Sequence, residues 1–316
     1  MITIYQTIDN KLTEVEEMSS GCWVNIYPPF DYNAINQISE KLGVYIEYFT
    51  DALDIDEQSR YEEDDDTKFI LLNIPIRNEQ LISNKRASFI TIPISIIFKD
   101  NIVITTSLYK NPIIDSIITK SSRKNLFQDI PNLVLNILDR NTDFFHYYLK
   151  QINIRFNDIE KILDTQANNQ DFVSILQLQK SLIYFETNLR SNNLMMVKMK
   201  RTNFLETKDN EEYDDFFDEV IIENQQAIEM TEVYSRILDS SMHTISTIIS
   251  NNVNTIVKRL TGATIILMLP SIISGLWGMN VPVPFGSHPF GFAFVSALTA
   301  ILIIGTVYIF FKKKWI

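Results

Sequence analysis

The chain is poor in glycine, proline and cysteine, and each shortage excludes something. Its 316 residues include only 8 glycines, 10 prolines and 1 cysteine. No glycine occurs between Gly43 and Gly262, and no proline occurs between Pro131 and Pro270. Because these two residues break helices, their absence permits very long helices there. The lone Cys22 excludes an internal disulfide and is typical of a chain in a reducing compartment.

Charge is missing from the C-terminal end of the chain. Residues 260–311 contain no Lys, Arg, Asp or Glu, whereas residues 1–259 hold nearly all the charge. Two apolar segments lie in the uncharged stretch, at about 260–279 and 290–311. Each is close to the roughly 20 helical residues that cross a hydrocarbon core about 30 Å thick. A buried core helix would explain one such segment, but two adjacent ones predict two transmembrane helices.

The flanks of these segments predict their orientation. Lys258 and Arg259 precede the first segment, three lysines at 312–314 follow the second, and the connection at 280–289 is uncharged. Positive flanks stay on the cytoplasmic side. We therefore expect a multi-pass protein of the cell membrane, with both termini cytoplasmic and the connecting loop outside. The N-terminal residues lack the basic start and apolar run of a signal peptide.

The net charge of −11 argues against a nucleic-acid partner, because phosphate binding needs a basic surface. An acidic surface suits a protein that meets cations, and it also keeps a protein soluble, so both interpretations stay open. The acidic tract at 51–66 is expected to be a solvated loop, with weak cation binding as the alternative.

The part before the membrane reads as an α/β domain followed by a stalk of long helices. β-Branched runs predict strands at 2–8, 22–27, 69–76, 89–98 and 102–107. Helices are predicted at 32–42, 113–119, 133–165 and 170–202, with a polar reversal near 208–210. A last helix from about 213 runs into the first membrane segment and would be about 100 Å long. The predicted divisions are 1–131 (α/β), 132–259 (stalk), 260–279 and 290–311 (membrane), 280–289 (outer loop) and 312–316 (basic tail).

Small and polar residues form a stripe along the first membrane segment and the helix before it. At steps of three and four residues, this face carries Asn254, Val257, Thr261, Thr264, Met268, Ser271, Gly275 and Gly278, and upstream it continues back to Ser240. Polar groups avoid lipid and turn towards protein or water. Small residues also make close helix contacts, so the stripe alone favours a pore and tight packing equally. A pore would require a ring of subunits, because the two membrane helices of a single chain cannot enclose a channel.

The tripeptide Gly278-Met279-Asn280 ends the first membrane segment, and the sequence NTIVKRLT at 254–261 leads into it. Together with two C-terminal spans, these residues resemble the CorA-type magnesium channels. The resemblance implies a funnel-shaped homopentamer in the bilayer, with five first spans around the pore and the tripeptide as selectivity filter at the outer mouth. It also implies that Leu260 and Met268 narrow the pore, although Leu260 lies one residue off the stripe.

The resemblance further implies closure by intracellular Mg²⁺ bound between cytoplasmic domains. Acidic residues in the comparable region are Asp214, Asp215, Asp218 and Glu219. Mg²⁺ would then be both the substrate and a regulatory ligand, with no resident cofactor. We expect one or two of these carboxylates to form an inhibitory site between subunits.

The chemistry of the tripeptide agrees with the resemblance. Mg²⁺ sheds its six waters reluctantly. The carboxamide of Asn280 and the carbonyl of Gly278 can accept hydrogen bonds from those waters, and neutral oxygens release an ion more easily than carboxylates do. No glycine-rich nucleotide-binding loop followed by lysine occurs, so the driving force would be electrical, roughly 4.6 kcal/mol for two charges per 100 mV. The sequence therefore predicts passive import of hydrated Mg²⁺, with Co²⁺ and Ni²⁺ as further candidate ions.

Two rival functions stay open. A zinc, cobalt or nickel transporter on the same scaffold would prefer Cys and His ligands, and His288 near the outer loop keeps this alternative. A two-span signalling receptor would explain the topology but not the stripe or the tripeptide. An enzyme is not expected, because no nucleophile, base and orienting group stand at a recognisable spacing. The outer loop carries no carboxylate, unlike many relatives, so neutral dipoles must recognise the ion.

Overall fold

The computed structural model describes residues 1–8, 11–78, 87–121, 130–163, 168–284, 286 and 289–313. The chain divides into two compact units, Met1–Asp239 and Ser240–Ile316. One helix, α6 (Glu211–Trp277), begins in the first unit and ends in the second. The second unit also contains the last helix, α7 (Gly291–Lys312).

The first unit is built on a seven-stranded sheet with the order β2-β1-β3-β7-β6-β5-β4. Its neighbouring strands are antiparallel except for β3 and β7, which are parallel. The strands are β1 (Ile2–Ile8), β2 (Lys11–Val15), β3 (Cys22–Ile26), β4 (Arg60–Asp64), β5 (Thr67–Arg77), β6 (Phe89–Lys99) and β7 (Ile102–Ser107).

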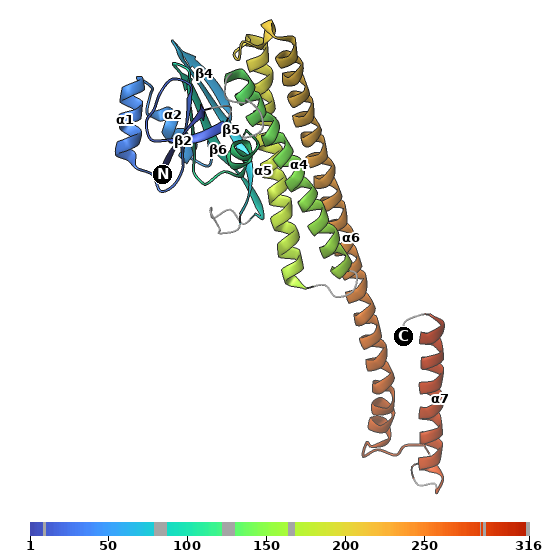
Figure 1. Cartoon of the computed structure of the whole chain (residues 1–316). Coiled ribbons are helices and arrows are strands. Elements are labelled where there is room, and N and C mark those ends of the chain that lie inside the picture. The colour runs from blue at the N-terminus through green and yellow to red at the C-terminus, as the bar shows by residue number, and fades with distance from the viewer. Residues whose placement is uncertain are drawn as a thin grey trace. The chain divides into compact units, whose positions relative to one another are not determined.

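Helices cover both faces of this sheet (Figure 1). The helical segments of the first unit are α1 (Tyr32–Leu42), α2 (Glu47–Thr50), η1 (Asp51–Leu53), α3 (Pro112–Ser121), α4 (Ile130–Leu163), α5 (Asn169–Thr202), η2 (Thr207–Asp209) and the first part of α6. Strand alternation separates two cores. In β5, Ile70 and Leu72 join the core shared with α4 and α5, whereas Phe69 and Leu71 join the core shared with α1 and α2.

The five strands expected from the sequence are confirmed within one or two residues at each end, and two further strands, β2 and β4, were missed. Both missed strands lie at an edge of the sheet. Edge strands tolerate charge on the side that no neighbour covers, and β4 reads Arg-Tyr-Glu-Glu-Asp. The expectation of a solvated loop throughout 51–66 is therefore wrong, because this tract holds η1 and β4.

The long helices are confirmed, and local sequence explains where they begin and end. α5 starts with a capping box between Asn168 and Asp171 and stops at Asn203, which adopts a left-handed conformation with φ 56°. The polar reversal is the short η2 turn. α6 then starts after Asn210 and continues through Pro270 without ending.

Buried asparagines attach the long helices to the sheet at one position. Strand β4 pairs with β5 only as far as Leu71, so the backbone of Asn73 has no strand partner on that side. The side chain of Asn192, fully buried on α5, replaces the missing strand. Its Oδ1 accepts from the Asn73 N–H at 3.2 Å, and its Nδ2 donates to the Asn73 carbonyl at 2.8 Å. Asn141 on α4 donates to the same carbonyl at 3.2 Å.

We expect Asn192→Leu to destabilise the first unit by about 1–3 kcal/mol, because it preserves side-chain volume but removes one hydrogen-bond partner from the buried Asn73 N–H and one from the Asn73 carbonyl, which leaves them only Ser59 and Asn141. Thermal unfolding of the detergent-solubilised protein should show a Tm several degrees lower. Lys198→Ala, on an exposed position of the same helix, should change stability by no more than about 0.5 kcal/mol. Equal Tm values for Asn192→Leu and the unmodified protein would contradict the role assigned to this amide.

Candidate functional site

The second unit has two helices that are long and apolar enough to cross a membrane, the last part of α6 and the whole of α7. On α6, the covered positions are Gly262, Ile266, Leu269 and Ile273, which recur every three or four residues. On α7, the covered or half-covered positions are Val295, Leu298, Thr299, Ile303, Thr306 and Phe310. Such spacing defines one face of a helix. Because both helices belong to one compact unit, we infer that these two faces cover one another.

The predicted stripe lies on the other side of α6. Its members Val257 and Met268 are 54% and 56% exposed, and Leu260, one residue off the stripe, is 67% exposed. The remaining predicted pore residues are also exposed, namely Asn254, Thr261, Thr264, Ser271 and Gly275. At 100° per residue, the stripe is centred about 160° from the covered face. A single chain therefore leaves uncovered the whole face that the sequence assigned to a pore.

The hydroxyl groups of this face are oriented as hydrogen-bond acceptors. Thr264 Oγ1 donates its proton to the Leu260 carbonyl at 2.8 Å, and Ser271 Oγ donates to the Leu267 carbonyl at 3.4 Å. Each hydroxyl has a single proton, which these bonds use. The lone pairs of its oxygen therefore remain able to accept hydrogen bonds. The face consequently offers oxygen acceptors to water molecules, including those around a hydrated cation.

The tripeptide Gly278-Met279-Asn280 follows directly on the last helical residue of α6, Trp277. The Gly278 N–H donates to the Ser274 carbonyl at 2.9 Å and closes the last turn. A Cβ at Gly278 would lie 3.1 Å from the same Ser274 oxygen, which is crowded, so glycine suits this position. The last carbonyls of a helix lack partners within the helix and carry the negative end of its dipole. The tripeptide therefore stands where backbone electrostatics favour a cation.

The outer loop folds back towards this end of α6. Trp277 Nε1 donates to the Pro284 carbonyl at 3.2 Å. Met279 and Asn280 are exposed. His288, which supported the zinc alternative, and the distal part of the basic tail, 314–316, lie outside the described residues.

The four acidic residues assigned to regulation divide into two pairs. Lys200 Nζ lies 3.2 Å from Asp214 Oδ2 and 2.6 Å from Asp218 Oδ1. Burial lowers the pKa of Lys200, but its hydrogen bonds to Asp218 and Asp214 outweigh burial and leave that pKa above the ordinary value. Asp215 and Glu219 are exposed one turn apart on α6. Among the described residues, no three acidic, His or Cys side chains of one chain are grouped to hold a metal.

Asp139 on α4 is a further titratable group at this place, and sequence reasoning missed it. Its carboxyl is partly buried and faces the carboxylates of Asp143, Glu223 and Glu219. Burial and then Asp143 raise its pKa to about 6, while Arg140 opposes them. Nothing in the local sequence signals this, because two of the neighbouring carboxylates come from α6.

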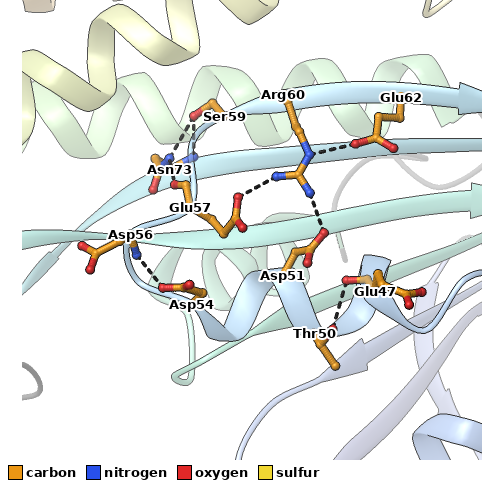
Figure 2. A network of polar contacts seen from close by, with 10 residues as sticks. All are labelled: Glu47, Thr50, Asp51, Asp54, Asp56, Glu57, Ser59, Arg60, Glu62 and Asn73. Carbon is orange, nitrogen blue, oxygen red and sulfur yellow. Dashed lines mark hydrogen bonds and ion pairs between the residues drawn. The ribbon is translucent and has the colours of Figure 1, made fainter.

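The acidic tract has its own internal cation (Figure 2). The guanidinium of Arg60 binds Asp51 at 2.5 Å, Glu57 at 2.8 Å and Glu62 at 2.8 Å. Burial raises the pKa of Asp51, and Arg60 acts in the opposite direction. Three carboxylates of the tract are thus already paired with Arg60 of the same chain. This pairing argues against the alternative of a site for a free cation there.

An α/β domain followed by long helices and two apolar helices of spanning length indicates a membrane protein. Residues 19–314 match the family described as CorA-like Mg²⁺ transporter protein, and the chain belongs to this family. It is 29% identical over 316 residues to the cobalt/magnesium transport protein CorA of Methanocaldococcus jannaschii, across 98% of the chain and 96% of that relative. The complete structure of the CorA magnesium transporter from that organism superimposes with a TM-score of 0.85 at 27% identity, covering 100% of the chain and 99% of that protein.

Two more distant relatives are informative. The cobalt/magnesium transport protein CorA of Thermotoga maritima is 20% identical over 97% of the chain and 88% of its own length. The cytoplasmic domain of ZntB from Vibrio parahaemolyticus gives a TM-score of 0.62 at 13% identity, over 79% of the chain and 98% of that domain. At that identity the second likeness shows a shared fold alone.

The environment of Asp139 predicts a pH dependence of stability. Its pKa of about 6 in the folded protein exceeds the model-peptide value of 3.8. Between these values the folded state binds more protons, so the free energy of unfolding should fall as the pH rises. We expect Asp139→Asn to flatten this slope and to stabilise the protein at pH 7 by on the order of 1–3 kcal/mol. Thermal unfolding between pH 4.5 and 7.5 tests it, with the exposed Asp158→Asn as control. Identical pH slopes for Asp139→Asn and the unmodified protein would remove the interpretation.

Proposed function

We propose that this protein imports hydrated Mg²⁺ passively, driven by the membrane potential, through the central pore of a homopentamer. The observation that carries the proposal is the uncovered polar face of α6, which ends at Gly278-Met279-Asn280 on the carbonyl end of the helix. The family to which the chain belongs and its match to CorA of M. jannaschii support the choice of ion.

The uncovered face supports an assembly of several chains. Leu260 and Met268 expose more than half of their surface in one chain. Five copies of α6 around a common axis would place these side chains against each other as narrow rings, with the hydroxyls of Thr264 and Ser271 between them. Each copy would add one Asn280 amide and one Gly278 carbonyl to the outer mouth. Both termini would then lie in the cytoplasm, as the positive flanks favour.

Ion recognition at this mouth depends on hydration. Mg²⁺ keeps its waters and can be held by second-sphere hydrogen bonds to amide and carbonyl oxygens. Backbone carbonyls at the end of α6 add the negative end of the helix dipole without a formal charge. The hydrated ion is therefore attracted but not trapped. Co²⁺ is a second candidate ion, since the curated relatives are named as cobalt/magnesium transport proteins.

Gating by intracellular Mg²⁺ is the second part of the proposal. Asp215 and Glu219 are exposed and adjacent on α6, but the described part of one chain does not group three potential ligands. A second subunit must therefore supply the remaining ligands or hydrogen-bond acceptors. Asp218 already neutralises Lys200 at 2.6 Å. It would bind Mg²⁺ only by giving up part of that ion pair, so Glu219 is the better candidate.

We expect Asn280→Ala to reduce Mg²⁺ flux by at least about tenfold, because a hydrogen-bond acceptor worth about 1 kcal/mol is lost in every subunit. Flux into proteoliposomes and growth rescue of a Mg²⁺-transport-deficient cell both measure it. Asn252→Ala removes the same amide from a different face of α6 and should transport normally. Rescue by Asn280→Ala at the unmodified level would contradict the proposal, and preferential Zn²⁺ flux would favour the zinc alternative.

Glu219→Gln should raise the Mg²⁺ concentration that half-inhibits the current by several-fold, and the double variant Asp218→Asn, Glu219→Gln should raise it at least as far. The reason is that each change removes negative charge from the proposed inhibitory site. Patch-clamp recording with varied cytoplasmic Mg²⁺ measures this. Glu212→Gln, an equal charge change in the first turn of α6, serves as control. Unaltered inhibition in the double variant would exclude these residues from sensing.

A further inference from the structure

The last turns of α7 carry an apolar groove, and the described residues that line it all come from α7. Its volume is about 640 Å³, within the range of ligand-binding pockets. The most exposed of its side chains are Ile304 at 68%, Tyr308 at 67% and Phe311 at 70%. The lining residues are Ile303, Ile304, Val307, Tyr308, Phe311 and Lys312.

The lining changes character along the helix. Aliphatic and aromatic side chains line the groove up to its C-terminal end. At that end the ammonium of Lys312 follows the phenol of Tyr308 by four residues. Positions four apart share one helix face, so the hydroxyl and the ammonium lie close together. A ligand that fits this sequence of groups has a hydrocarbon body and an anionic end.

No acidic side chain of the membrane unit can neutralise Lys312. Residues 240–316 contain no Asp or Glu at all. A second copy of the membrane unit packed on this groove would therefore cover the apolar side chains but would bring no carboxylate to the ammonium. An anionic lipid satisfies both ends of the groove, since its acyl chain matches the apolar part and its phosphate matches Lys312.

We propose that this groove is a binding site for one anionic phospholipid of the cytoplasmic leaflet. The acyl chain lies along Ile304, Val307 and Phe311, and the phosphate accepts hydrogen bonds from Lys312 and from the Tyr308 hydroxyl. The inference rests on the membrane orientation given in the proposed function. Free phosphate is a poor occupant, because it leaves the apolar part of the groove uncovered.

Native mass spectrometry of the full-length protein tests the site, with phosphatidylglycerol and phosphatidylcholine of identical acyl chains added to the delipidated protein. We expect phosphatidylglycerol to bind more tightly. Lys312→Gln should weaken its binding about fivefold, the contribution of one lysine near an anionic surface. Lys313→Gln, the same charge change on a neighbouring residue outside the groove lining, should have a clearly smaller effect.

A second pair of variants tests the apolar part. Ile304 and Ile301 are almost equally exposed, at 68% and 66%, but only Ile304 lines the groove. Ile304→Ala should weaken both lipids, whereas Ile301→Ala should weaken neither. Glycerol 3-phosphate, which has the charge without the chains, should not displace the bound lipid.

Three results would overturn the proposal. Equal losses for Lys312→Gln and Lys313→Gln would show diffuse attraction to the membrane surface. Equal behaviour of Ile304→Ala and Ile301→Ala would show that no groove is involved, and absence of any retained lipid would show that another chain covers it. Asn280→Ala should leave lipid binding unchanged, so a failure of the transport proposal and a failure of the lipid site give different outcomes.

Discussion

The continuity of one helix is the constraint on which the rest of the molecule depends. α6 extends over 67 residues from Glu211 to Trp277 and belongs to both compact units. Its first turns carry the acidic residues that contact Lys200, and its last turn presents the tripeptide. Isolated helices depend on tertiary packing for their stability, so α6 needs α4 and α5 at one end and α7 at the other. Its remaining uncovered surface is what a second subunit would have to protect.

Pro270 is the residue within α6 that most strongly disfavours a continuous helix. Proline lacks an N–H and leaves the carbonyl four residues earlier without its helical partner. The sequence suggested an interruption at this point, yet the helix continues through it. Membrane helices tolerate proline where nearby hydroxyl groups supply substitute hydrogen bonds. The carbonyl concerned here is that of Ile266, and the nearby Ser271 Oγ donates instead to the adjacent Leu267 carbonyl at 3.4 Å.

The sequence was most informative where one physical requirement dominates. Charge-free runs of spanning length predicted both helices that are long and apolar enough to cross a membrane, and the absence of helix breakers predicted α4, α5 and α6 to within a few residues. The edge strands β2 and β4 were missed because an edge strand need not be apolar, so pairing with the adjacent strand decides its conformation. Contacts such as Asn192 with Asn73, or Asp139 with Glu223, join residues over 80 positions apart. No local pattern encodes them, because they exist only after the helices have packed.

The same distinction applies to the site. The stripe follows from helical periodicity and the tripeptide from the family resemblance, so both could be numbered residue by residue in advance. The ion pairs and the pKa of each acidic residue could not be predicted in this way, because they depend on which side chains lie near it in the folded protein. Asp218 and Glu219 are adjacent in sequence, yet Asp218 is 2.6 Å from a lysine, whereas Glu219 makes only a small contribution to the negative charge around the partly buried carboxyl of Asp139. Binding a divalent cation near Glu219 would reduce the repulsion on Asp139, whereas binding at Asp218 must compete with Lys200. Within a single chain, Asp218 is therefore already paired with Lys200, whereas Glu219 adds to the negative charge around Asp139.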